Sequence, residues 1–252
     1  MKTLAFVTGA SRGLGEAIAG ELIARGTDTL VGISRSRNEA LENAARQADC
    51  TLEWIQADLS RLDTIPSISS KAFSGRDPAS WDRIVLINNA GVVDPVARVG
   101  TASNDALIRN VHVNTVAPLC LANSFVHAFD GAPGRRVIIN ITSGLAKRPM
   151  AGVSAYCVTK AGLDMLTACI AVEQEGKENP VEVYGSSPGT VQTDMQRTLR
   201  GSSPEDLPDR DHFAGLYERG ELLSAEFSAR KTVDMLDIPG LESGEVYRTT
   251  QL

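Results

Sequence analysis

The sequence predicts a single α/β domain in which a doubly wound parallel sheet carries helices on both faces. Apolar strand patterns alternate with helical patterns six times or more, and a glycine-rich turn joins the first strand pattern to the first helical one. The 252 residues suit one domain with a substantial core, and they contain no internal repeat or low-complexity segment. We therefore expect one domain over residues 1–252.

The first strand and the turn after it predict a dinucleotide site. Thr3 to Val7 is a short apolar run, followed directly by Thr8-Gly9-Ala10-Ser11-Arg12-Gly13-Leu14-Gly15 and by a helical pattern through Ala24 that Gly26 ends. Glycines let the backbone approach a pyrophosphate, and the helix N-terminus offers it free N–H groups. This context indicates a Rossmann-like fold, although Gly-x-x-x-Gly-x-Gly differs from the commonest fingerprint.

The end of the second strand, Thr29 to Ser34, bears on the choice of cofactor. A site selective for NAD usually places an acid about twenty residues after the glycines, where it binds the ribose 2′-hydroxyl. Arg35 stands there instead, and Arg12 lies within the glycine turn. Because guanidinium groups bind phosphate bidentately, we predict NADPH/NADP as the cofactor rather than NAD.

Tyr156 and Lys160 indicate acid–base chemistry. They are four residues apart in a helical pattern, so they share a helix face, and Ser143 lies thirteen residues before the tyrosine. An ammonium beside a phenol lowers the tyrosine pKa from about 10 toward the range of a good general acid. A lone Tyr-x-x-x-Lys is common on exposed helices, so the pair gains weight from the dinucleotide signature upstream.

Composition restricts the class of partner and the compartment. The net charge of −6 and the pI near 5.2 argue against nucleic acid and anionic membranes. The apolar run at the N-terminus is too short for a signal peptide, and no apolar stretch approaches eighteen residues, so no membrane span is expected. The four cysteines lack paired spacing and the three histidines are scattered, which predicts a cytoplasmic protein with reduced thiols and no metal.

Taken together, these residues resemble the short-chain dehydrogenase/reductase family across essentially the whole chain. Further family motifs follow in the expected order, each near the end of a predicted strand or on a helix. They are Ala57-Asp58-Leu59 after the third strand, Asn88-Asn89-Ala90-Gly91 after Ile84 to Ile87, Val111-His112-Val113-Asn114, Ser143 after Val137 to Ile141, and Pro188-Gly189-Thr190-Val191-Gln192-Thr193.

The resemblance implies a role for each motif. Asp58 would contact the adenine, Asn114 would hold a water beside Lys160, and the segment from Pro188 would hold the nicotinamide carboxamide. The implied catalytic set is Ser143, Tyr156, Lys160 and Asn114. The residues expected to contact the cofactor are Gly9, Ser11, Arg12, Gly13, Leu14, Gly15, Ser34, Arg35, Asp58, Leu59, Asn89, Ala90, Gly91, Tyr156, Lys160, Pro188, Gly189, Val191 and Thr193.

A narrower resemblance concerns the substrate. The segments Tyr156 to Leu166, Thr193 to Gln196 and Ser243 to Arg248 resemble the sepiapterin reductase branch, and parts of them are closest to microbial benzil-type diketone reductases. Animal pterin reductases anchor the pterin with an aspartate in the C-terminal tail. Residues 247–250 here contain no acid, so a hydrophobic ketone or 1,2-diketone is the expected carbonyl substrate.

Residues 194–221 change in composition, with one glycine, two serines, two prolines and several charges from Gly201 to Phe213, and are expected to form a substrate lid. The residues expected at the substrate are Val93, Leu145, Met150, Met195, Phe213 and Tyr217. A pterin reductase remains an alternative, as does a non-catalytic NADP-binding sensor, against which the intact catalytic set argues. By resemblance, helices near 104–128 and 155–175 would pair copies into a homo-oligomer, a dimer or tetramer.

Overall fold

The computed structural model describes residues 1–252 and contains one sheet of seven parallel strands in the order β3-β2-β1-β4-β5-β6-β7. The chain moves outward from β1 to β3, then crosses back to β4 and continues to β7, which confirms the doubly wound prediction. The strands are β1 (Thr3–Thr8), β2 (Thr29–Ser34), β3 (Thr51–Gln56), β4 (Arg83–Asn88), β5 (Arg135–Ile141), β6 (Val181–Ser187) and β7 (Val246–Arg248).

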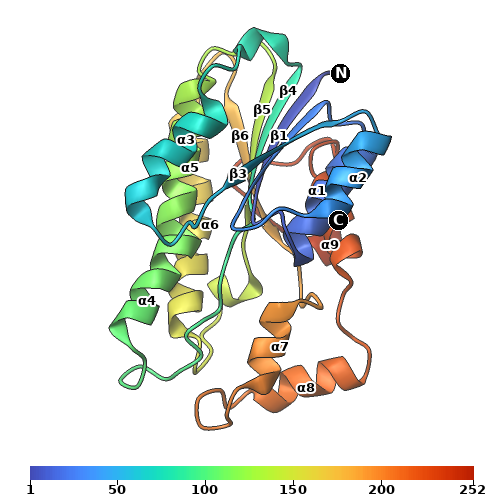
Figure 1. Ribbon diagram of the computed structural model, residues 1–252. Helices are drawn as coiled ribbons and strands as arrows, with labels where there is room; N and C mark the ends of the chain where they lie inside the picture. Colours follow the sequence, from blue (N-terminus) through green and yellow to red (C-terminus); the bar gives the residue numbers. More distant parts are fainter.

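Helices cover both faces of this sheet (Figure 1). One layer contains α1 (Gly13–Ala24), α2 (Glu39–Gln47) and α9 (Ala225–Asp234). The other contains α3 (Ile65–Phe73), α4 (Asn104–Val111), α5 (Ala117–Ala128) and α6 (Ser154–Gln174), with a π-helical turn at His112–Val116 between α4 and α5. Because both faces are covered, the inner strands are buried along their whole length and read as continuous apolar runs.

Each layer has its own core. Between the sheet and the α3–α5–α6 layer, four phenylalanines pack edge to face, with the rings of Phe6 and Phe73 4.9 Å apart at 75°. A second cluster of aliphatic side chains fills the space between the sheet and α1 and α9. Full burial of each large apolar side chain contributes roughly 1.5–3 kcal/mol, so these two cores hold the strand ends in place.

The stretch 194–221 forms two helices, α7 (Asp194–Gly201) and α8 (Arg210–Glu218). They follow β6 and lie beyond the carboxyl end of the sheet, apart from both helical layers (Figure 1). On α8, the side chain of Phe213 is buried, whereas Tyr217 is 51% exposed. The change of composition at residues 194–221 thus corresponds to a separate pair of helices. They lie beyond the carboxyl edge of the sheet, where the functional residues are.

Helix α6 bears on the expectation that no segment spans a membrane. It has 21 residues and a stretch with a mean hydropathy of 1.3, so by length and composition alone it could cross a membrane. In this fold it is a core helix that packs against β6, with Leu163 and Thr167 buried. The expectation of no membrane span agrees with this place in the fold, and polar residues such as Lys160 interrupt the apolar run.

Candidate functional site

The carboxyl ends of β1, β2, β4, β5 and β6 open into one cavity of about 1500 Å³. Such a position at the strand ends is where doubly wound sheets bind ligands. Every residue expected to contact the cofactor lines it, as do Ser143, Tyr156 and Lys160. Two expected site residues, Asn114 and Met150, do not line it.

The glycine turn forms a cradle at one end of the cavity. Gly9 and Gly13 have positive φ values of 70° and 58°, which favour glycine. A Cβ on Gly15 would lie 2.2 Å from the Gly9 carbonyl oxygen and 2.4 Å from Asn89 Nδ2, so no side chain fits there. The first N–H groups of α1 receive no side-chain cap from Arg12. They remain available to a pyrophosphate, which fits a dinucleotide.

The loop after β4 is fastened to this cradle. Thr8 Oγ1 accepts hydrogen bonds from the backbone N–H groups of Asn89 and Ala90, both at 2.9 Å. Asn89 Nδ2 in turn donates to the Thr8 carbonyl at 2.9 Å. The turn after β1 and the loop after β4 therefore form one rigid wall.

The two arginines expected at the 2′-phosphate differ in their environments. Arg35 is exposed, lines the cavity and has no ion pair or side-chain hydrogen bond. Arg12 instead donates to Asp194 on α7 at 3.2 Å, in a pair whose side chains are 66% and 51% exposed. An exposed pair of this kind contributes roughly 0–1 kcal/mol, so it would yield readily to a phosphate. Arg35 is thus the unpaired cation at the end of β2.

Asp58 follows β3 by two residues and lines the cavity at the carboxyl edge of the sheet. Its Oδ1 accepts hydrogen bonds from the backbone N–H and the hydroxyl of Ser60 at 3.0 and 2.8 Å. The backbone N–H of Ser60, more than the nearby Arg35 and Arg109 charges, lowers the pKa of this carboxyl. The carboxylate is therefore ionised and held in place, facing the cavity.

Ser143, Tyr156 and Lys160 meet at the centre of the cavity. Ser143 follows β5, and the other two lie on α6, where they are 8% and 3% exposed. The Lys160 ammonium is 5.6 Å from the centre of the Tyr156 ring and donates to the Ile141 carbonyl at 2.7 Å. The Ser143 hydroxyl accepts a hydrogen bond from the Leu145 N–H at 3.2 Å and is near enough to the Tyr156 phenol to oppose the rise in its pKa. The three polar groups predicted from spacing are thus brought together.

The electrostatics of this group differ from the sequence expectation. Burial raises the pKa of Tyr156 to about 12, against the opposing hydrogen bond from Ser143, and burial lowers the pKa of Lys160 to about 8. Lys160 directs its ammonium at the Ile141 carbonyl rather than at the phenol, so it does not offset the desolvation of Tyr156. The phenol is therefore fully protonated at neutral pH.

Asn114 lies behind the cavity wall and is 1% exposed. Its Oδ1 accepts from the Val92 N–H at 2.8 Å, and its Nδ2 donates to the Val92 carbonyl at 2.8 Å. The amide is thus committed to the strand-end loop. Its main-chain carbonyl lacks the i+4 donor of a regular α-helix, because residue 118 is a proline without an N–H.

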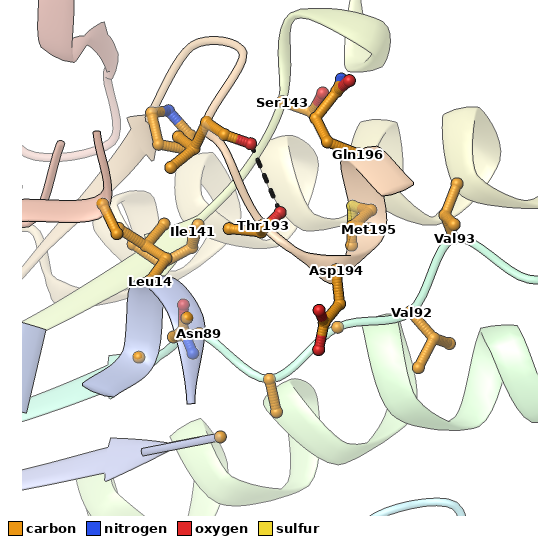
Figure 2. Close-up of a pocket in the computed structure, with 18 of the residues that line it drawn as sticks. Leu14, Asn89, Val92, Val93, Ile141, Ser143, Thr193, Asp194, Met195 and Gln196 are labelled. Carbon is orange, nitrogen blue, oxygen red and sulfur yellow. Dashed lines mark hydrogen bonds between the residues drawn. The ribbon is translucent and has the colours of Figure 1, made fainter. Parts of the chain in front are cut away.

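The far end of the cavity is apolar. Val93, Met150, Tyr156 and Phe213 belong to one buried cluster, against which Leu145 and Met195 pack. Five of the six expected substrate residues line the cavity; Met150 is 8% exposed but packs behind the lining. Figure 2 shows Val93, Met195 and Ser143 around this end.

Other lining residues were not foreseen from the sequence. They are polar or cationic and come mainly from α7 and from loops: Arg109, Arg148, Gln196, Arg200 and Arg248. Of these, Gln196 and Arg200 carry a signal that could have been found, because they are four residues apart and share a face of one helix.

Comparison with known proteins agrees with this geometry. The short chain dehydrogenase family model matches residues 3–203. The chain belongs to this family. It is 38% identical to a protein named benzil reductase ((S)-benzoin forming) from Bacillus cereus, covering 96% of this chain and 97% of that one. It is 32% identical to sepiapterin reductase from Bos taurus, covering 96% and 92%.

A solved structure also matches. The crystal structure described as KRED1-Pglu enzyme superimposes with a TM-score of 0.80 at 27% identity, covering 98% of this chain and 100% of that one. As a member of the short chain dehydrogenase family, the protein is an oxidoreductase that acts on CH–OH or C=O groups and uses a nicotinamide dinucleotide. The cradle of Gly9, Gly13 and Gly15 fits that dinucleotide.

Gly15→Ala tests the cradle. The added Cβ has no space, so we expect cofactor affinity to fall by about ten- to a hundredfold, the equivalent of 1–3 kcal/mol of overpacking. Gly20→Ala is the matched control on the same helix, because its Cβ would meet only Leu41 at an ordinary 3.7 Å. Titration of cofactor fluorescence measures both, and equal affinities in the two variants would contradict the cradle.

Lys160 predicts a pH dependence of stability. Its folded pKa is about 8, whereas an unfolded lysine titrates near 10.5, so the unfolded chain binds more protons between these values. The free energy of unfolding should therefore gain a rising contribution as pH increases from 8 toward 10. Urea denaturation of the cofactor-free protein should show this rise relative to Lys160→Met. Parallel curves for the two proteins would refute it.

Proposed function

We propose that this protein is an NADPH-dependent carbonyl reductase that converts a small hydrophobic ketone or 1,2-diketone, such as benzil, into one enantiomer of an alcohol. One observation carries the proposal: Ser143, Tyr156 and Lys160 meet where a dinucleotide cradle adjoins an apolar pocket end. The 38% identity to a protein named benzil reductase supports the diketone. An apolar lining suits aromatic rings, and an adjacent carbonyl eases hydride addition.

The chain's own residues perform the proton chemistry. When bound, the reduced nicotinamide supplies the hydride to the carbonyl carbon. The phenol of Tyr156 is protonated at neutral pH and gives its proton to the oxygen that becomes an alkoxide. The Ser143 hydroxyl, which lies near that phenol, donates to the same oxygen.

Lys160 supports the proton transfer from Tyr156. Its ammonium is fixed by the Ile141 carbonyl and would hold the nicotinamide ribose when the cofactor is bound. Asn114 keeps the loop of Val92 in place, and its main-chain carbonyl, which lacks an i+4 donor, would carry a water that returns the proton.

Preference for NADPH rests on the end of β2. Arg35 has no partner within the protein, Ser34 precedes it, and no acid occupies the position that would bind a 2′-hydroxyl. A dianionic phosphate would complete the coordination of Arg35 and draw Arg12 from its exposed pair with Asp194.

A pterin reductase is the second candidate, favoured by the 32% identity to sepiapterin reductase. The tail weighs against it. Arg248 and Thr250 line the cavity there, and no carboxylate accompanies them to bind a pterin ring. A sensor without turnover would not need a buried, protonated phenol beside a serine.

The remaining assignments belong to the same proposal. Residues 194–221 act as the substrate lid, within one domain of residues 1–252, in a cytoplasmic enzyme. Copies pair through α4, α5 and α6, where large apolar side chains lie exposed: Ile108, Val111, Leu119, Val158, Met165 and Val172. Sedimentation velocity tests the pairing, and a monomer at micromolar concentration would refute it.

The deciding assay compares benzil and sepiapterin as substrates with NADPH, followed by chiral analysis of the product. We expect efficient reduction of benzil to one enantiomer of benzoin. Tyr156→Phe should bind NADPH normally but lose about two to four orders of magnitude in kcat, the usual contribution of general acid catalysis. Turnover of sepiapterin with none on diketones would favour the pterin alternative, and no turnover of any carbonyl compound would favour the sensor.

Arg35→Asp tests the cofactor. Loss of a charge-assisted hydrogen bond costs about 1.5–3 kcal/mol, so the affinity for NADPH should fall by roughly ten- to a hundredfold while that for NADH improves. Arg37→Asp is the matched control, since Arg37 is paired with Glu42 and does not line the cavity. Equal use of NADH and NADPH by the unaltered enzyme would sink the assignment.

A further inference from the structure

Helix α7 presents two polar side chains to the cavity, and neither side chain forms a hydrogen bond or an ion pair within the protein. Gln196 and Arg200 are four residues apart, so they lie on one face of the helix, and both line the cavity. Neither takes part in the glycine cradle or in the group formed by Ser143, Tyr156 and Lys160.

Gln196 is 5% exposed, and its Oε1 is buried without a hydrogen bond. Its amide makes no side-chain hydrogen bond at all, although a buried amide normally has at least one partner. Gln196 and Ser143 both line the cavity, and Figure 2 labels both among its lining side chains. The free amide thus belongs to the same cavity in which the reacting carbonyl oxygen would bind Ser143.

Arg200 is half-buried, and its Nη1 is buried without a partner. Its guanidinium stacks on the ring of Tyr217, with 3.7 Å between the guanidinium carbon and the ring centre. The nearest acid along the helix, Asp194, is already paired with Arg12 and Arg197. Stacking orients the guanidinium while its N–H donor stays free for a ligand.

We propose that Gln196 and Arg200 form a subsite for the second oxygen of the substrate, carried by the carbon next to the reacting carbonyl. This assignment rests on the proposed carbonyl reductase function. The reacting oxygen takes the donors of Ser143 and Tyr156, so the neighbouring carbonyl must find others. Arg200 Nη1 supplies one, and the Gln196 amide, whose oxygen and nitrogen exchange places by a rotation of the side chain, supplies the second.

The subsite explains a selectivity for 1,2-dicarbonyl compounds over simple ketones. A site built to hydrogen-bond a substrate oxygen discriminates against the analogue that lacks it, because its buried polar groups then stay unpaired. The apolar side chains around it, such as Phe213 and Met195, take the organic substituents on either side.

The experiment pairs two ketones with two variants. Benzil and deoxybenzoin have the same two phenyl rings, but deoxybenzoin has a methylene in place of one carbonyl. Gln196→Met keeps the length of the side chain, Arg200→Met keeps only the aliphatic part of a longer one, and both remove the polar atoms. We expect kcat/KM for benzil to fall about three- to tenfold in Gln196→Met and about ten- to a hundredfold in Arg200→Met, with deoxybenzoin changed less than about threefold.

Thr198→Ala is the control on the same helix, because Thr198 is exposed and does not line the cavity. It should leave both ketones unaffected. If either substitution at 196 or 200 lowers both ketones equally, or lowers neither, the subsite is overturned while the reductase assignment stands.

If the unaltered enzyme reduces neither ketone, the proposed function fails, and binding then decides the subsite. Melting temperatures are measured with saturating NADP⁺ and either ketone. A larger rise with benzil than with deoxybenzoin that disappears in Gln196→Met and Arg200→Met supports the subsite. Equal shifts in all proteins overturn it.

Discussion

The hydrogen bonds of Thr8 hold together the parts on which the site depends. One hydroxyl accepts two backbone N–H groups from the loop after β4, and this draws that loop against the glycine turn until Gly15 has no room for a side chain. The chain of polar contacts continues inward. Asn88 donates to Asn140 on β5, and Asn140 donates to Thr167 on α6, both at 2.9 Å.

This chain joins the two halves of the site. It begins at the dinucleotide cradle and ends at Thr167, on the helix that carries Tyr156 and Lys160, about two turns from Lys160 and three from Tyr156. Asn140 and Thr167 are fully buried, so each hydrogen bond lost there would leave a polar group unpaired in the core. The spacing between cofactor and proton donor is therefore set by the core of the sheet rather than by surface loops.

The sequence predicted the strands and helices around the cofactor end well. It predicted the positions of individual site residues less completely. The strand Thr29–Ser34 and the end of α1 at Ala24 match because buried strands and glycine stops are local signals. Asn114 and Met150 could not be placed in the same way, since their positions depend on distant partners such as Val92 and the α7–α8 helices. The pKa of Tyr156 was misjudged because helix spacing places Lys160 nearby but does not reveal the Ile141 carbonyl that captures it.

The cofactor end and the substrate end of the cavity differ in the groups that line them, and this difference bears on substrate selectivity. The cofactor end consists of backbone groups, glycines and buried amides, so few substitutions would fit there. The substrate end is lined by side chains from several elements, α7 and α8 among them, and Gln196 and Arg200 on α7 have no hydrogen-bond partner there. Relatives named for benzil and for sepiapterin both match over more than nine-tenths of the chain, so the fold does not select the substrate. We infer that the side chains that α7 and α8 direct into the cavity contribute to that selection.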